Sequence, residues 1–430
     1  MKKSFSITSF SFCVIIIGLL TTMTMTSCLE DTCDETQRFL EYTTVYVQPE
    51  EFRIPIVTES TQEMEETGKF YFYNNNILIN EKNKGIHVID NSNPESPQNI
   101  AFVEIPGNLD MAIRDNILYA DNYVDLLTID ITDINNPRLL CRDEDVFENY
   151  GFREELGYFI GYESTGRTIE VDCNSPNFGS EQFQRGNFEL FDSNIGAPSG
   201  NTTTGGTATD GQAGSQARFS LKNDYLYVIN NSELISYNIE NPSKPDQTNT
   251  TTVSWNIETL FPYEDYLFIG SQNGVFIYDL ASPESPEYLS DFQHANACDP
   301  VFVKDDIAYV TLRDGTMCQN FINQLDVLDV SNIRNPRLIK SYDMEHPHGL
   351  SVRGNNLYLC EGEHGLKVFE TDELEKIDDN RIDHVKDIDA FDAISLNADH
   401  LLVIGADGLY QYDTSDPSKL KEMSFLSVAK

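Results

Sequence analysis

The stretch KGIHVIDNSNPESP, residues 84–97, combines a β-favouring apolar segment with a turn that two prolines stiffen. Variants of it return as NGVFIYDLASPESP at 273–286 and as DGLYQYDTSDPSKL at 407–420. A phrase that recurs at a fixed interval indicates a repeat architecture, and the number of repeats decides the fold. The stretch is therefore interpreted as one unit of a repeat.

Each unit closes its apolar segment on Asp, Asn or Glu, and the units recur about every 41 residues apart from one large and one modest insertion. The closing side chain can hydrogen-bond backbone groups of the turn that follows. Seven segments fit: GIHVID (85–90), DLLTID (125–130), ELISYN (233–238), GVFIYD (274–279), QLDVLD (324–329), GLKVFE (365–370) and GLYQYD (408–413).

One histidine of the opening stretch, His87, is a candidate reactive group. Set beside the other units it shares no chemistry with the aligned residues, so we interpret the stretch as structural. Those aligned residues are Leu127, Ile235, Phe276, Asp326, Lys367 and Tyr410.

Three more short β-favouring segments accompany each closing segment, and no convincing helix lies between them. Four short strands in about 41 residues are typical of a propeller blade. The sequence therefore predicts an all-β fold, a seven-bladed β-propeller of four-stranded blades over residues 67–430. Residues 68–75 supply an innermost strand without a blade of its own, and 421–430 supply an outer strand. We expect these N- and C-terminal strands to close the ring, which leaves no open edge.

Two segments fall outside the repeats. Residues 28–66 are expected to form a stalk that becomes extended and then packs on the ring. Residues 142–216 form an insertion between the second and third blades, and it ends in a Gly/Ser/Thr run that is too poor in apolar residues to fold alone. The insertion could decorate a binding face or be a flexible loop without a task.

The phrases GLKVFE, DVLDVSNIRNP and GIHVIDNSNP resemble the LVIVD-repeat family of β-propellers, which are common in secreted bacterial proteins. The resemblance covers about residues 67–430 and concerns structural motifs, so it implies the fold and transfers no catalytic residue. The sixth unit departs from the pattern, because ETDELEKI replaces the proline turn.

The N-terminus has the features of an export signal. Lys2 and Lys3 precede an apolar run at 10–20 that is too short to cross a bilayer. The residues MTSC at 25–28 resemble a bacterial lipobox, which implies a signal peptide at 1–27 and lipidation of Cys28; an ordinary secretory signal is the alternative. The acidic residues after Cys28 resemble the surface-export signals of Bacteroidota lipoproteins. We therefore expect an outer-membrane lipoprotein displayed on the cell surface.

Export places the remaining cysteines where disulfides persist. Cys298 and Cys318 flank one hairpin, and Cys141 and Cys173 flank the start of the insertion, so these are the two candidate pairs. Neither has the spacing of a CxxC metal site.

The chain carries 70 acidic and 29 basic residues, a formal net charge of −41. This balance excludes nucleic acid as a partner, since binding it requires neutralisation of phosphates. It favours a solvated surface and attraction of cations.

One ionisable residue recurs at the entry end of each innermost strand, where propellers open onto a central channel. Such a ring could bind a divalent cation or a polar group, with Asp299, His348 and Asp392 as the most metal-like corner; alternatively, it could only satisfy its own charges. The ring is Lys69, Asp110, Arg218, Glu258, Asp299, His348 and Asp392.

No motif of a nucleophilic, metal-dependent or nucleotide-dependent enzyme occurs, so no catalytic residue and no cofactor is predicted. The sequence favours a monomeric, non-catalytic envelope lipoprotein that binds or scaffolds an envelope protein or an extracellular ligand. The alternative is an extracytoplasmic hydrolase or lyase that uses the acids and His348 at the channel mouth. A purely structural envelope protein is a third possibility.

Overall fold

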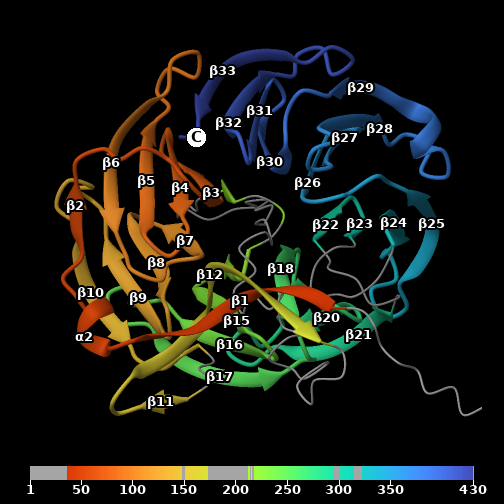
Figure 1. Cartoon of the computed structure of the whole chain (residues 1–430). Coiled ribbons are helices and arrows are strands. Elements are labelled where there is room, and N and C mark those ends of the chain that lie inside the picture. The colour runs from red at the N-terminus through yellow and green to blue at the C-terminus, as the bar shows by residue number, and fades with distance from the viewer. Residues whose placement is uncertain are drawn as a thin grey trace, which may run out of the picture. The chain divides into compact units, whose positions relative to one another are not determined.

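The computed structural model describes residues 36–147, 151–172, 212, 213, 215, 217–293, 300–313 and 322–429. The contacts divide the chain into unit 1, residues 1–43 and 163–187, and unit 2, residues 44–162 and 188–430. Almost all regular structure is β-strand, in eight sheets of mostly four antiparallel strands (Figure 1).

Six sheets of unit 2 contain four strands in chain order, and we number them 2 to 7. Sheet 2 contains β7 (Met111–Arg114), β8 (Ile117–Asn122), β9 (Asp125–Asp130) and β10 (Arg138–Asp143). Sheet 3 contains β14 (Phe219–Lys222), β15 (Tyr225–Asn230), β16 (Glu233–Asn238) and β17 (Asp246–Thr252). Sheet 4 contains β18 (Ile257–Tyr263), β19 (Tyr266–Ser271), β20 (Gly274–Asp279) and β21 (Glu287–Gln293).

The C-terminal part repeats this plan. Sheet 5 contains β22 (Val301–Lys304), β23 (Ile307–Leu312), β24 (Gln324–Asp329) and β25 (Arg337–Asp343). Sheet 6 contains β26 (Leu350–Arg353), β27 (Asn356–Cys360), β28 (Leu366–Glu370) and β29 (Arg381–Val385), with the 3-10 helix η1 (Ile377–Asn380) before β29. Sheet 7 contains β30 (Ala390–Asn397), β31 (His400–Gly405), β32 (Gly408–Asp413) and β33 (Lys421–Ser427).

Sheet 1 follows the same order but has an extra strand on each side. Its repeat strands are β3 (Thr67–Tyr73), β4 (Asn76–Glu81), β5 (Gly85–Asp90) and β6 (Gln98–Glu104). β2 (Val57–Glu59) pairs with β6, and β13 (Gln212–Ala213) pairs with β3. Parts of the expected stalk and of the expected insertion are thus strands of sheet 1.

The eighth sheet has the order β1-β12-β11 and contains β1 (Thr36–Val47), β12 (Gly157–Asp172) and β11 (Phe152–Arg153). The short helix α2 (Pro49–Phe52) follows β1. In unit 1, the Thr165 hydroxyl donates to the Glu41 carboxylate at 2.9 Å. In the part of the chain that the structure describes, no helix is long and apolar enough to cross a membrane.

Apolar side chains pack between neighbouring sheets of unit 2. The alternation of each strand places them on the sheet faces, where burial removes them from water. Clusters of this kind lie between sheets 1 and 2, 2 and 3, 3 and 4, 6 and 7, and across sheets 4 to 6. A further cluster joins sheet 7 to sheet 1, where Phe70 and Ile77 meet Ile394 and Leu402.

The prediction for the turn residues is confirmed. The Asp90 carboxylate accepts a hydrogen bond from the Ser92 N–H at 2.9 Å, and Asp279 accepts one from the Ala281 N–H at 2.8 Å. The other closing residues with the same bond are Asp130, Asn238, Asp329 and Asp413. The sixth unit, which departs from the sequence pattern, uses η1 at this point and still forms its outer strand β29.

The C-terminal end strand lies as we expected, whereas the N-terminal one does not. β3 heads sheet 1 as the innermost repeat strand, and β33 is the outer strand of sheet 7, so residues 68–75 do have a sheet of their own. The reason is that residues 390–397 already supply the innermost strand of sheet 7, which leaves no position there for β3.

Candidate functional site

Six of the seven expected ring residues belong to the described part of the chain, three inside the innermost repeat strands and three shortly before them; Glu258 lies inside β18. Lys69 and Asp392 lie inside β3 and β30, whereas Asp110, Arg218 and His348 come shortly before β7, β14 and β26. Asp299 lies outside the described residues.

Sheets 1, 2 and 3 are joined by a buried ion pair. Lys69 Nζ lies 3.0 Å from Asp110 Oδ2, and the same oxygen accepts the Arg218 backbone N–H at 2.6 Å. Both side chains of the pair are buried, and burial lowers the pKa of Lys69. The Asp110 carboxylate is therefore occupied by groups of the protein itself.

A second carboxylate, Asp121 on β8, supports this pair. Its Oδ1 accepts the backbone N–H groups of Leu109 at 2.8 Å and Asp110 at 3.0 Å, and its Oδ2 lies 3.8 Å from the Arg218 guanidinium. Burial raises the pKa of Asp121 to about 6, although Arg218 and these N–H groups oppose the rise. The sequence did not single out Asp121, because it lies one strand away from the ring positions.

Asp392 is held by the end of the insertion. Its Oδ1 accepts the Ser215 N–H and hydroxyl, both at 3.1 Å, and the Ala393 N–H at 2.9 Å. The Ser215 hydroxyl oxygen also accepts the Leu350 N–H at 2.7 Å. Ser215 therefore links sheets 6 and 7, while Gln212–Ala213 pairs with sheet 1 as β13.

His348 is enclosed by two other polar side chains. Arg313 donates to its Nδ1 at 2.7 Å, and its Nε2 lies 3.2 Å from His346 Nδ1. The same Arg313 nitrogen also lies 3.2 Å from Nε2, so the arginine contacts both ring nitrogens. Burial, Arg313 and His346 hold the pKa of His348 well below its ordinary value. The imidazole is thus neutral, and both nitrogens are engaged.

The divalent-cation prediction gains no support from the described residues. No group of three His, Cys, Asp or Glu side chains among them is arranged to hold a metal ion. His348 is bonded to Arg313, and Asp392 is bonded to Ser215. Glu258 lies 3.4 Å from the Gln272 amide.

The cysteine predictions lie mostly outside the described residues, as do the lipidation site Cys28 and the cysteines Cys173, Cys298 and Cys318. Cys141 is a free, half-buried thiol in the structure, so neither expected disulfide is confirmed.

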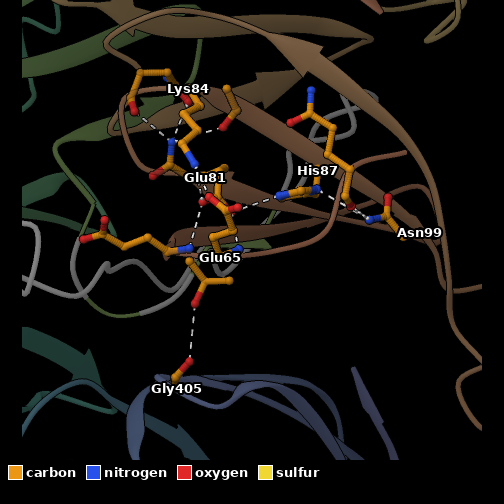
Figure 2. Close-up of polar contacts among 12 residues, drawn as sticks. Glu65, Glu81, Lys84, His87, Asn99 and Gly405 are labelled. Atoms are coloured by element: carbon orange, nitrogen blue, oxygen red, sulfur yellow. Dashed lines mark hydrogen bonds and ion pairs between the residues drawn. The ribbon is translucent and has the colours of Figure 1, made fainter. Parts of the chain in front are cut away.

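The structure shows how His87, interpreted above as structural, is bonded. Its Nε2 lies 3.1 Å from Glu81 Oε2, and both side chains are buried (Figure 2). The same Glu81 carboxylate accepts the backbone N–H groups of Glu65 at 3.0 Å and Glu66 at 2.8 Å. Burial raises the pKa of Glu81, but His87 and the two N–H groups more than offset this, so the pKa lies below its ordinary value.

Sheet 6 contains the equivalent pair. Glu361 precedes Gly365 by four residues, as Glu81 precedes Gly85, and Lys367 occupies the place of His87. Glu361 Oε1 accepts the Glu345 N–H at 2.8 Å, and Lys367 forms ion pairs with both Glu361 and Glu345. The sequence contains a signal for both pairs. In each unit an acidic residue precedes the first glycine of the closing segment by four positions, and a basic residue follows that glycine by two.

Comparison with known proteins agrees with this architecture. Residues 296–344 match the LVIVD repeat family. A comparison with curated protein sequences found no match.

Three solved structures share the fold at low identity. The computationally designed protein Ika8 is 9% identical, with 86% of this chain and 91% of that chain covered and a TM-score of 0.51. Sqt1 of Saccharomyces cerevisiae is 9% identical, with 87% and 88% covered and a TM-score of 0.50. The periplasmic gluconolactonase PpgL of Pseudomonas aeruginosa is 12% identical, with 84% and 96% covered and a TM-score of 0.50.

Sqt1 and PpgL are β-propellers, and at these identities the likeness concerns the fold alone. Residues 296–344 are therefore similar to an LVIVD repeat, and the fold of the chain is similar to that of β-propellers.

Proposed function

We propose that this chain is a non-catalytic, lipid-anchored component of a bacterial cell envelope. Its seven-bladed, closed propeller binds or scaffolds an envelope protein or an extracellular ligand, as a monomer. The observation that carries the proposal is the bonding of the ring: the acids and the histidine at the inner strand ends are engaged by groups of the same chain.

Contacts between the first and last sheets support closure. The side-chain amides of Asn91 and Gln411 form two reciprocal hydrogen bonds, at 2.7 and 3.1 Å. The Thr67 hydroxyl donates to the Gly405 carbonyl at 3.3 Å (Figure 2), and an apolar cluster joins the same two sheets. Together with the contacts between the innermost strands of successive sheets, these bonds support the proposal of a closed ring of seven blades.

Bonding within the ring weakens the case for catalysis there. A general acid or base needs a nitrogen or oxygen that can reach a substrate, with a pKa near the working pH. His348 is neutral with both ring nitrogens engaged, and Asp110 is bonded to Lys69 and to the Arg218 N–H. Asp121 is the one observation that favours the hydrolase or lyase alternative, because its pKa of about 6 suits a general acid.

Exposed aromatic side chains are the candidate contacts for a partner. Aromatic residues dominate the energetics of protein interfaces and also stack on sugars. Trp255, the single tryptophan of the chain, is 75% exposed, and Tyr288 and Phe152 are 55% and 50% exposed.

A binding screen tests the proposal. Wild-type protein is compared on a glycan array and in envelope-protein capture with two variants: Trp255→Ala, and a protein whose residues 174–210 are replaced by a Gly-Ser linker. The replacement keeps Gln212–Ser215 and hence their bonds to sheets 1, 6 and 7. We expect saturable binding of one ligand class, lost in one variant and kept in the other.

Catalysis is tested in parallel. We expect no turnover in a hydrolase and lyase substrate panel. Turnover that Asp121→Asn abolishes while the protein stays folded would establish the enzymatic alternative instead.

The anchor is tested in cells. We expect radiolabelled fatty acid to be incorporated into the wild-type protein and not into Cys28→Ser, and protease treatment of intact cells to degrade the wild-type protein. Labelling without protease sensitivity would support the anchor and contradict surface display.

A further inference from the structure

Sheet 4 differs from sheet 1 at an equivalent point of the repeat, the end of the sheet where its innermost strand begins. In sheet 1, the Lys82 N–H donates to the Glu66 carbonyl at 3.1 Å. In sheet 4, the Gln272 N–H donates to the Asn256 carbonyl at 3.2 Å. Each carbonyl belongs to the residue directly before the innermost strand, and each N–H to the turn between the next two strands. Asn256 therefore takes the place of Glu66, and Gln272 takes the place of Lys82.

Ion pairs cover this place in sheet 1. Lys82 Nζ lies 3.3 Å from Glu66 Oε1, and the preceding residue, Glu65, forms an ion pair with Lys84. The charges of these four side chains compensate one another, so this end of sheet 1 is satisfied by its own residues.

Sheet 4 has uncharged, planar side chains instead. Asn256 Nδ2 donates to Gln272 Oε1 at 2.8 Å, where sheet 1 has its lysine–glutamate pair. Trp255 takes the place of the preceding glutamate and is 75% exposed. Tryptophan is highly buried on average, so an indole that is left in water at this point indicates a contact surface.

The backbone holds Trp255 in place. On one side of it, the Val253 N–H donates to the Ser232 carbonyl at 2.9 Å. On the other side, the Ile257 N–H donates to the Asn231 carbonyl at 2.7 Å. The segment that carries the indole is therefore anchored at both ends, and such preorganisation reduces the entropy that is lost when a ligand binds.

The amides of this turn keep hydrogen-bonding capacity. Asn256, Gln272 and Glu258 are half-buried, so water reaches them. An amide nitrogen carries two hydrogens. Asn256 uses one of its hydrogens for Gln272, and Gln272 uses one for Glu258, whose carboxylate lies 3.4 Å away. One N–H of each amide and the side-chain oxygen of Asn256 are therefore available to a ligand.

We propose that Trp255, Asn256 and Gln272 form a binding site for a neutral carbohydrate. The face of the indole ring attracts the C–H groups of a sugar ring, while the amides donate to and accept from its hydroxyl groups. This site rests on the proposed binding function and gives that function a ligand class and a place on the molecule.

Charge and polarity decide between ligand classes. The chain carries a net charge of −41, and the Glu258 carboxylate contacts Gln272, so anionic polysaccharides are repelled. Both residues that flank Trp255 in the chain, Ser254 and Asn256, are polar. Such surroundings suit the hydroxyl groups of a sugar better than the apolar core of a protein interface.

Intrinsic fluorescence tests the site directly, because Trp255 is the only tryptophan of the chain. The purified full-length protein is titrated with dextran, mannan and xyloglucan, and with polygalacturonate and chondroitin sulfate as anionic counterparts. We expect at least one neutral polysaccharide to shift the emission to shorter wavelength and to protect the indole from quenching by acrylamide, because stacking removes the ring from water. The anionic polysaccharides should cause neither change. This measurement needs no substitution.

Variants identify the contacting groups, by isothermal titration calorimetry with the polysaccharide that shifts the emission. Trp255→Ala should weaken binding about tenfold or more, and Trp255→Phe should recover part of the loss because it keeps an aromatic face. Gln272→Ala should weaken binding about fivefold, the equivalent of one hydrogen bond. Tyr288→Ala is the matched control, because Tyr288 is an exposed aromatic residue on the outer strand of the same sheet; it should leave the affinity unchanged.

Trp255 fluorescence that responds to none of the three neutral polysaccharides would overturn the site, and so would a response to a captured envelope protein alone. Glycan binding on the array without a response of Trp255 would also refute this site, while the proposed binding function would stand at another place on the molecule. Absence of any binding by the wild type, on the array and in envelope-protein capture, would refute both.

Discussion

Sheets 1 and 6 place a buried glutamate at the same point of the repeat and join it to different basic side chains. In sheet 1, Glu81 is bound by His87, by two backbone N–H groups and, at 3.6 Å, by the partly exposed Lys84 (Figure 2). In sheet 6, Glu361 is bound by one backbone N–H and by Lys367. The place of the glutamate in the repeat is thus fixed by backbone geometry, whereas the groups that compensate its charge differ between the two sheets.

The same repeat position therefore accommodates a buried glutamate whose charge is compensated by different basic residues. Glu81 has several donors, so each carries a part of its stabilisation. Glu361 has fewer donors and therefore depends more strongly on Lys367. Six substitutions, in four experiments, test this difference between the two sheets.

Lys367→Leu should have the largest effect. It leaves the fully buried Glu361 without its ammonium partner, and removal of one member of a buried ion pair destabilises a protein by about 3 kcal/mol or more. Urea denaturation measures the free energy of unfolding. Lys376→Leu is the control, because its ion pair with Glu373 is exposed and should contribute little. Equal losses in the two variants would contradict the argument.

Glu81→Gln should come second, with a loss of about 2 kcal/mol at neutral pH, because an amide nitrogen would face N–H donors. The folded-state pKa of Glu81 lies below its ordinary value of 4.5, so the ionised carboxylate stabilises the fold above that pH. This contribution is lost as the pH falls through the folded-state pKa. Unfolding free energies measured against pH should therefore converge for wild type and variant in acid. A difference that stays constant with pH would refute this.

His87→Leu should cost less than Lys367→Leu, about 1 kcal/mol. Glu81 keeps its two N–H donors and Lys84, and leucine can retain the apolar contact with the Phe102 ring, which lies 4.9 Å from the imidazole. The comparison of the two leucine variants by urea denaturation is the direct check. A larger loss at His87 would reverse our interpretation of the two sheets.

Asp279→Ala should have the smallest effect, about 0.5 to 1 kcal/mol, because it removes the turn bond to the Ala281 N–H at an exposed position. Glu370→Ala is its counterpart in the sixth unit, where η1 replaces the proline turn, and it should change stability less. Chemical denaturation of both variants decides the order, and a greater loss at Glu370 would speak against the role of the turn.

The repeats made the fold predictable because they are local. A closing segment such as 85–90 contains its strand and its turn within a few residues, so period and turn chemistry could be read directly. The bonds of Asp90 and Asp279 are of this local kind. The sheet that residues 68–75 join was predicted incorrectly, because residues 390–397 already supply the innermost strand of sheet 7.

The site was less predictable because its contacts join distant parts of the chain. Lys69 and Asp110, two residues of the expected ring, form an ion pair in the structure. Ser215 lies at the end of a Gly/Ser/Thr-rich insertion. No periodic pattern of apolar residues in that insertion indicates that Ser215 hydrogen-bonds to Asp392. Arg313 beside His348 is likewise a contact that only the packing of neighbouring sheets creates.

If the seven sheets close into one ring, Asn91 and Gln411 must interact, and a double-mutant cycle between them measures that interaction. The two residues belong to the first and last sheets and are 320 positions apart. Unfolding free energies are measured for Asn91→Ala, Gln411→Ala and the double variant. We predict a coupling energy of about 1 kcal/mol, as for residues in direct contact. Strictly additive effects of the two substitutions would show that sheets 1 and 7 do not meet and would contradict closure.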